Sequence, residues 1–355
     1  MHGKREWSWE SRTRNRENRL IRHWLFWCMG LLLLAAVVPL PAAAQCMAYV
    51  PTHKSNSVAV IETSVDRVVA VIPVQIQPLA VAITPNGAFV YVSNSGWVFG
   101  SNSVSVIATA SNSVVATIPV GSFPVGVAIT PNGAAAYVAN FNSNSVSVIN
   151  TATNAVTATV TVGNGPWGLA IAPNGSFAYV TNLNSNNVSV INTVTNTVVA
   201  TVPVGSGPVA AAIAPNGAHA YVTNSFSDTV SVISTATNTV VATVPVVSGS
   251  YTSGPYAVAV TPNGAFVYVA NAAASTVSVI NTATNSVAAT IPVGSTPHGV
   301  AITTDGAFAY VTNEYSSTVS VIDTATNTVV DTVAGVAVAP EGIAITPHQG
   351  AVSCR

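Results

Sequence analysis

Charged side chains are scarce in this sequence. Only 6% of the 355 residues are Asp, Glu, Lys or Arg, and seven of the ten basic residues precede residue 45. The rest of the chain keeps three basic and eight acidic residues, a net charge near −5. It has no basic track for a phosphate backbone, so we expect no nucleic-acid partner. Recurring Val, Ile, Ala and Tyr still supply apolar surface for a core.

Long apolar runs are absent except near the N-terminus. There a basic segment precedes an apolar run, residues 24–40, which ends in the small residues 41–44. This order predicts a signal peptide over residues 1–44, cleaved after Ala44, and an extracytoplasmic protein (secreted, periplasmic or on the cell surface) with no membrane span after cleavage. One alternative is an uncleaved anchor, for which the run is short. Another is a lipoprotein at Cys46, which Gln45 in front of it disfavours.

Cysteine is rarer still, with three residues in the whole sequence. Cys28 falls in the predicted signal peptide, which leaves Cys46 and Cys354 at the two ends of the remaining chain. In an oxidising compartment, two cysteines placed in this way predict a disulfide that joins the termini. Two free buried thiols are the alternative.

Local catalytic motifs are missing as well. The sequence has no Gly-x-Ser-x-Gly elbow, Cys-x-x-Cys pair, His-Glu-x-x-His helix or Walker loop. Residues 163–168 contain the letters of a dinucleotide-binding motif, but we expect a strand and not a helix after them. Function therefore has to be sought in the arrangement of distant residues.

An internal repeat accounts for nearly all of the remaining chain. Its copies align on one tyrosine and recur every 42–47 residues, at Tyr49, Tyr91, Tyr137, Tyr179, Tyr221, Tyr268 and Tyr310. In the copy that contains Tyr179, alternating apolar residues and turn signals predict four strands, at 168–172, 177–181, 188–192 and 198–204. A period near 40 with four short strands is typical of a β-propeller.

Residue size along the unit predicts the order of the strands. The first strand is rich in Ala and Gly, which suits the crowded axis, whereas the fourth carries a proline such as Pro203, which suits an edge. The chain begins at a second strand and ends after a first strand, so residues 341–346 should complete the blade begun by residues 47–74. We therefore predict an all-β, seven-bladed propeller of four-stranded blades over residues 45–355.

The tyrosine lies in a recurring tetrapeptide. Tyr-Val-Ser/Thr/Ala-Asn occurs six times, at 91–94, 137–140, 179–182, 221–224, 268–271 and 310–313, and the first copy reads Tyr-Val-Pro-Thr at 49–52. This signature resembles the YVTN-family β-propeller repeat proteins, which include surface-layer-like secreted propellers. The resemblance implies export and a scaffold more than a reaction.

Variation among the copies points to one face. Two insertions, at 95–100 and 247–254, both lengthen loops of what we call the upper face, and they carry Trp97, Phe99 and Tyr251. The residue after the proline that enters each first strand also varies, and one such residue per blade should rim the axial mouth. We call these the mouth residues: Leu79, Val125, Trp167, Val209, Tyr256, His298 and Glu341.

Polar residues gather on the same face near the seam of the ring. His298 and Glu314 belong to the blade before the seam, and His53, Lys54 and Glu341 belong to the seam blade. His53, His298, Glu314 and Glu341 are therefore candidate catalytic residues for acid-base chemistry, or ligands of a divalent metal. A solvated group of unrelated loop side chains is the alternative. No cofactor beyond such a metal is predicted.

These features favour a binding role. We expect a secreted scaffold that holds a small ligand or a protein or cell-envelope partner on its upper face, with contacts from Trp97, Phe99, Trp167, Tyr251, Tyr256, His298 and Glu341. A secreted hydrolase or lyase that uses the His/Glu cluster is the first alternative. A purely structural cell-surface protein is the second.

Overall fold

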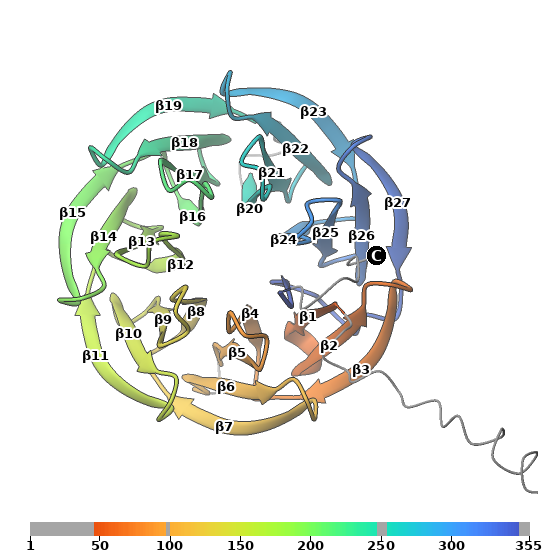
Figure 1. Ribbon diagram of the computed structural model, residues 1–355, viewed down its shortest axis with the longest axis horizontal. Helices are drawn as coiled ribbons and strands as arrows, with labels where there is room; N and C mark the ends of the chain where they lie inside the picture. Colours follow the sequence, from red (N-terminus) through yellow and green to blue (C-terminus); the bar gives the residue numbers. More distant parts are fainter. Residues whose placement is uncertain (1–45, 97–99, 247–253, 348–355) are drawn as a thin grey trace, which may run out of the picture. The chain divides into compact units, whose positions relative to one another are not determined.

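The computed structural model describes residues 46–96, 100–246 and 254–347. These residues form seven antiparallel four-stranded sheets arranged as blades around a central axis, which confirms the predicted seven-bladed propeller (Figure 1). The predicted signal peptide at 1–44 lies outside the described residues. Within the described ranges, no helix is both long and apolar enough to span a bilayer.

Each blade repeats the same strand order from the axis outwards. The innermost strands are β4 (Pro78–Ile83), β8 (Pro124–Ile129), β12 (Pro166–Ile171), β16 (Pro208–Ile213), β20 (Pro255–Val260), β24 (Pro297–Ile302) and β28 (Ala344–Ile345). The second strands are β1 (Met47–Thr52), β5 (Phe89–Asn94), β9 (Ala135–Asn140), β13 (Phe177–Asn182), β17 (His219–Asn224), β21 (Phe266–Asn271) and β25 (Phe308–Asn313).

The two outer layers follow in the same way. The third strands are β2 (Ser57–Glu62), β6 (Ser103–Ala108), β10 (Ser145–Asn150), β14 (Asn187–Asn192), β18 (Thr229–Ser234), β22 (Thr276–Asn281) and β26 (Thr318–Asp323). The outermost strands are β3 (Arg67–Pro73), β7 (Ser113–Pro119), β11 (Ala155–Thr161), β15 (Thr197–Pro203), β19 (Thr239–Pro245), β23 (Ser286–Pro292) and β27 (Thr328–Val333) (Figure 1). Five of them end in the predicted proline, which cannot donate to a further strand.

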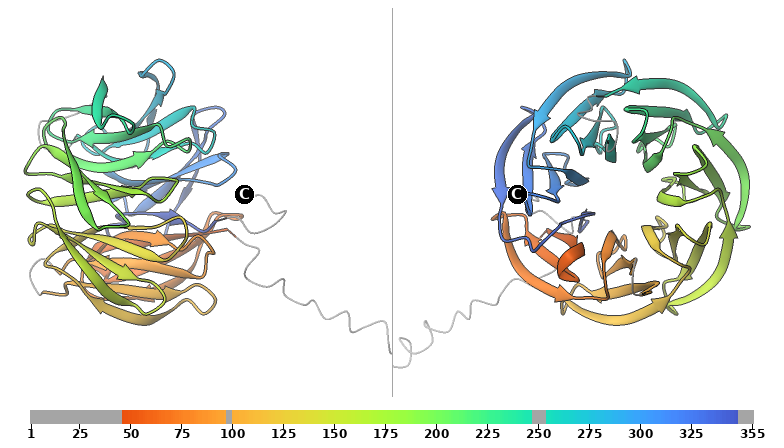
Figure 2. Two further views of the ribbon diagram at one scale, coloured as in Figure 1. Left: turned by 60° about the vertical axis from the view of Figure 1, so that its left-hand side comes forward. Right: turned by 180° about the vertical axis from the view of Figure 1, so that it is seen from behind.

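The ring closes where the sequence predicted. β28 pairs with β1 through Ala48–Ile345 and Tyr49–Ala344, so the two ends of the propeller lie side by side (Figure 2). The closing strand is shorter than the expected 341–346, and within that stretch Gly342 donates its amide to Leu79 of the next blade at 3.0 Å. The other inner strands show a register break at the corresponding place, so the seam blade follows the common pattern.

The hydrophobic core lies between blades. One cluster joins Tyr49, Val58 and Val60 of the first blade to Val90 and Val92 of the second, and similar clusters follow around the ring. The cluster at the seam joins Ala48 and Ile61 to Tyr310 and Val321. Each blade is therefore stabilised mainly by its neighbours, as expected for a repeat architecture.

The repeated tyrosines latch adjacent blades together. All seven are at most 1% exposed, and six donate their hydroxyl to an Asn or Asp in the turn before the outermost strand of the next blade. Tyr137, for example, bonds Asn196 at 2.7 Å, and Tyr310 bonds Asp66 across the seam at 2.6 Å. The turn residues have positive φ (52° at Asn196, 47° at Asp66), a conformation that Asn and Asp tolerate better than most side chains. The Asn or Asp at this turn thus shapes the turn and accepts the tyrosine hydrogen bond in six of the seven blades.

The asparagine of the tetrapeptide ties the second strand to the third. Asn182, for example, donates its side-chain amide to Ser189 at 2.9 Å, and the other asparagines make the equivalent bond. In the first copy, where Thr52 replaces the asparagine, its hydroxyl lies 2.7 Å from that of Ser57. The departure from the repeat therefore keeps a polar link between the same two strands.

Candidate functional site

The repeat itself fixes the backbone at the axial mouth. In four blades, the Ser or Thr of the tetrapeptide donates its hydroxyl to the carbonyl of the mouth residue in the next blade: Ser93 to Val125, Thr181 to Val209, Thr223 to Tyr256 and Thr312 to Glu341. At the seam, Glu341 also donates its amide to Pro51 at 2.9 Å. Framework residues therefore hold the main chain while the mouth side chains are free to differ.

In four of the seven blades a glycine follows the mouth residue, and it lets neighbouring blades lie close together. A Cβ on Gly168 would stand 2.4 Å from the Val209 carbonyl oxygen, and one on Gly299 would stand 2.5 Å from that of Glu341. Both distances are far below van der Waals contact, so these positions require glycine. The narrow axis that results places the mouth side chains around one small opening.

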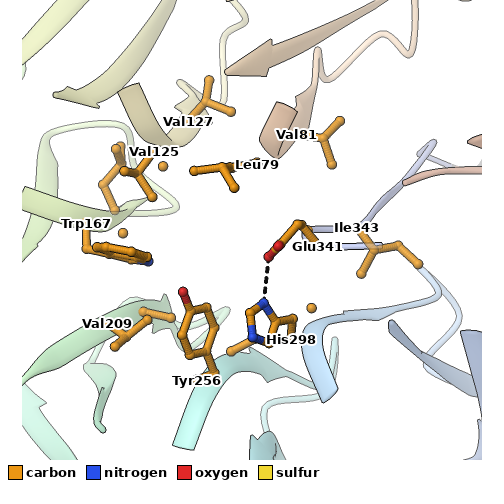
Figure 3. A pocket seen from close by; sticks show the side chains of 18 of the residues that line it. Leu79, Val81, Val125, Val127, Trp167, Val209, Tyr256, His298, Glu341 and Ile343 are labelled. Atoms are coloured by element: carbon orange, nitrogen blue, oxygen red, sulfur yellow. Dashed lines mark hydrogen bonds and ion pairs between the residues drawn. The ribbon is translucent and has the colours of Figure 1, made fainter. Parts of the chain in front are cut away.

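All seven mouth residues line a single cavity of about 250 Å³ at the axis (Figure 3). In ring order the cavity has two unlike sides. Leu79, Val125, Trp167 and Val209, from four consecutive blades, form what we call the apolar arc. Tyr256, His298 and Glu341, from the remaining three, form the polar arc. Such an arrangement of mostly apolar walls with a few convergent polar groups is typical of small-molecule sites.

A histidine between two carboxylates dominates the polar arc. His298 Nδ1 lies 2.6 Å from Glu341 Oε2, and His298 Nε2 lies 3.6 Å from Glu314 Oε2. The three side chains keep only 12–15% of their surface exposed. Because an ionised carboxylate can only accept, Nδ1 donates to Glu341, and in the neutral ring Nε2 keeps the lone pair. Lys54, from the 3₁₀ turn His53–Ser55, lies 3.9 Å from Glu314 on the outer side of the cluster.

These contacts set the protonation of His298. Burial lowers the pKa of His298, but the hydrogen bond to Glu341 and the charges of Glu341 and Glu314 outweigh it, so that the pKa lies above its ordinary value of about 6.5. A buried imidazole that lines a cavity and is held by a carboxylate is suited to proton transfer.

An aromatic chain supports the same side chain. The ring of Tyr256 stacks on that of His298 with centroids 4.2 Å apart, and Trp167 meets Tyr256 edge to face at 6.2 Å. Burial and the charges of Glu341 and Glu314 raise the pKa of Tyr256 well above its ordinary value, against a hydrogen bond with Trp167 that lowers it. Tyr256 therefore keeps its proton, and its hydroxyl can donate a hydrogen bond to a ligand.

The other residues predicted from the sequence are placed differently. His53 is not one of the three described residues whose donor atoms lie within 4.8 Å of one another, which are His298, Glu314 and Glu341. Its amide bonds Ala339, and its Nδ1 is buried with no hydrogen-bond partner among the described residues. Trp97, Phe99 and Tyr251, predicted as partner contacts, lie outside the described residues. So does Cys354, and the predicted disulfide with the buried Cys46 stays a prediction.

Sequence reasoning missed two supports of the site. Phe141 packs edge to face on Trp167 at 5.5 Å, and Phe123 packs on Phe141 at 5.6 Å, extending the aromatic chain to the rim. The Thr312 hydroxyl accepts from the amide of Gly299 at 2.7 Å and donates to the main-chain carbonyl of Glu341. One hydroxyl therefore links the main chain next to His298 to the main chain of Glu341. The Ser/Thr position of the tetrapeptide was the available signal for the second support.

Solved structures of the same fold are numerous. The propeller superposes on hydrazine synthase from Kuenenia stuttgartiensis with TM-score 0.70 and 24% identity, over 82% of this chain and 99% of that one. It superposes on a periplasmic gluconolactonase from Pseudomonas aeruginosa with TM-score 0.71 and 17% identity, over 86% and 99% of the two chains. A putative 6-phosphogluconolactonase from Bacteroides uniformis gives TM-score 0.71 and 16% identity, over 85% and 99%. At these identities the likeness establishes the fold.

Sequence comparison with curated proteins finds no match. The more specific resemblance to YVTN-family surface-layer-like propellers is not confirmed by these comparisons. A family model does match most of the sequence, over residues 22–161 and 192–347, and it describes a lactonase, 7-bladed beta-propeller. The chain therefore belongs to the lactonase family of seven-bladed β-propellers.

Proposed function

We propose that this protein is an extracytoplasmic hydrolase that opens a lactone at the axial mouth. The observation that carries the proposal is the His298–Glu341 pair, which lines a small axial cavity in a chain of the lactonase family. Structural neighbours named gluconolactonase and putative 6-phosphogluconolactonase support the same reaction class, and the periplasmic neighbour supports the location. The sequence alone favoured a binding scaffold; family membership and the converged polar arc favour the hydrolase alternative.

The geometry suits activation of a water molecule. Neutral His298 Nε2 takes a proton from water as the water oxygen attacks the lactone carbonyl carbon, while Glu341 holds the Nδ1 proton and stabilises the imidazolium that forms. Glu314, 3.6 Å from Nε2, can accept a hydrogen bond from the second O–H of that water and so orient it, and this proton stays on the water oxygen. The carbonyl oxygen becomes an oxyanion, to which the protonated Tyr256 hydroxyl donates. The ring C–O bond then breaks, and His298 returns its proton to the leaving oxygen, giving a hydroxy acid.

The same donor atoms fit a metal less well. Glu341 is bonded to Nδ1, so an ion bound at Nε2 of His298 would have Glu314 as its single neighbouring carboxylate in the cluster. Catalytic zinc sites use three protein ligands. We therefore propose a metal-independent reaction, and a chelator should leave the rate within about twofold of the untreated enzyme. If a chelator abolished the activity and one divalent ion restored it, the metal-independent mechanism would be wrong and a metal-dependent one would take its place.

A pH-stat assay tests the proposed reaction. Purified protein is mixed with γ- and δ-lactones, and acid release is compared with the spontaneous rate and with the His298→Asn variant. The proposal expects hydrolysis that depends on His298 and persists in Tyr137→Phe, a matched change far from the mouth in the tyrosine latch. Circular dichroism checks that the protein is folded. If the folded protein opens no lactone in the panel faster than buffer does, a binding scaffold becomes the favoured function.

A further inference from the structure

The charges around the cavity have one dominant sign. Among the residues that line it, Glu341 is the one carboxylate and His298 is the one group that can become positive. Glu314 stands directly behind His298. A protonated His298 is therefore already neutralised by two carboxylates, so the polar arc has no positive charge left for an anionic ligand.

Permanent cations lie elsewhere in the described chain, which contains Lys54 and Arg67 and no other Lys or Arg. Lys54 is not part of the cavity lining; its exposed side chain faces Glu314 and lies 5.7 Å from the centre of the Tyr315 ring. Arg67 begins β3, the outermost strand, and pairs in register with Glu62 at the end of the blade opposite to the mouth. Neither cation is placed to bind a phosphate or carboxylate group that occupies the cavity.

The apolar arc can hold hydrocarbon groups of a ligand. The apolar arc presents Leu79, Val125 and Val209 near Trp167, and Val127 from the same strand as Val125 also lines the cavity (Figure 3). Val125 and Val209 are at most 4% exposed, so their places in the wall are fixed by packing. Apolar groups of a ligand that cover this wall would gain affinity in proportion to the area that they bury.

The size of the cavity restricts the ligand further. About 250 Å³ is below the roughly 300–1,000 Å³ of pockets that hold drug-sized molecules. A single lactone ring at the polar arc, with a short chain on the apolar arc, matches both its volume and its division into two sides.

We propose that the substrate is an uncharged lactone with a short aliphatic substituent, and not a phosphorylated or carboxylated sugar lactone. The inference rests on the proposed lactone hydrolysis and refines it. The ester carbonyl lies against Tyr256 and His298, and the substituent lies along the apolar arc. The neighbour whose name contains 6-phosphogluconolactonase thus shares the fold of this chain without predicting its substrate.

Two substrate comparisons test the proposal in the full protein. In δ-lactones of increasing side-chain length, kcat/KM should rise about fourfold for each methylene group until the cavity is filled. Between glucono-δ-lactone and its 6-phosphate, the phosphorylated compound should be slower by roughly a hundredfold or more, because its charge meets Glu341 without a paired cation. Equal or faster turnover of the phosphate, or no gain with chain length, would overturn the inference.

A substitution in the apolar arc tests whether the missing positive charge is what excludes the phosphorylated lactone. Leu79→Arg brings a guanidinium to the cavity wall, and Leu79→Met is the matched control of similar volume without charge. The ratio of kcat/KM for the phosphorylated over the uncharged lactone should rise at least about tenfold in Leu79→Arg and stay unchanged in Leu79→Met. An unchanged ratio in Leu79→Arg contradicts the charge argument. Absence of hydrolysis for every lactone contradicts the proposed function instead, so the two failures are distinguishable.

Discussion

Two rings of residues run around this propeller, each with one member per blade. The tyrosine ring is uniform: all seven members are the same residue, and six make the same bond to the next blade. The mouth ring has seven positions with six residue types, and four of its carbonyls are held by the tetrapeptide hydroxyls. The tyrosine position is the same in every blade because each interface between blades needs the same contact. The mouth position differs from blade to blade because all seven residues line one cavity and can contact one ligand together.

The largest effect should come from the mouth ring, in His298→Ala. Removal of the proposed base should lower kcat/KM for lactone hydrolysis by roughly 10²–10⁴-fold while the unfolding midpoint changes little. Steady-state rates and a thermal melt of the same preparation measure both. If activity and stability fall together, His298 belongs to the framework and the contrast between the rings fails.

The next effect should come from Tyr256→Phe. This change keeps the ring that stacks on His298 and removes the hydroxyl, so kcat should fall by about 10²-fold with KM nearly unchanged, as for loss of one oxyanion donor. Stopped assays at saturating lactone give kcat directly. A rise in KM alone would assign Tyr256 to ground-state binding and leave the oxyanion without its proposed donor.

The smallest effect should come from the tyrosine ring. Tyr137→Phe loses the bond to Asn196 and should destabilise the protein by about 0.5–1.5 kcal/mol, with no change in lactone hydrolysis. Tyr221→Phe is the internal control, because its expected partner Asn285 has a buried Oδ1 with no hydrogen-bond partner among the described residues. Urea unfolding should therefore show a smaller loss for Tyr221→Phe. Equal losses would mean that the hydroxyl bond is not what makes the latch.

The fold could be predicted from the sequence because the same pattern of four strands and their turns recurs seven times. The turn residues, the edge prolines and the strand at which the repeat begins and ends are all given by short stretches of sequence. The hydrogen bond between Tyr137 and Asn196 was missed although the tyrosine recurs in every unit and the turn residue is always Asn or Asp. The bond joins different blades, and no local sequence pattern measures that distance.

The candidate site was predictable in outline and not in detail. The position after each proline indicated which side chains rim the axis, and all seven line the cavity. The 2.6 Å contact between His298 and Glu341, and the stacking on Tyr256, depend on side-chain directions that spacing does not give. His53 was grouped with them because it follows the seam strand, yet its own amide is bonded to Ala339 of the closing segment.

The pH dependence of kcat/KM for an uncharged lactone, in wild type and Glu341→Gln, tests the His298–Glu341 pair most directly. His298 must be neutral to take a proton, and Glu341, Glu314 and the stacked Tyr256 face it, while Lys54 lies behind Glu314. Because the carboxylates raise the pKa of His298, wild-type activity should rise with pH to a midpoint above about 6.5.

In Glu341→Gln the loss of a charged hydrogen bond, about 1.5–3 kcal/mol, should move that midpoint to lower pH and reduce the plateau. Glutamine can still accept from Nδ1, so the imidazole orientation is retained while the charge is removed. A midpoint that is the same in both proteins would contradict the account, since the group that limits the reaction would then not be the histidine held by Glu341.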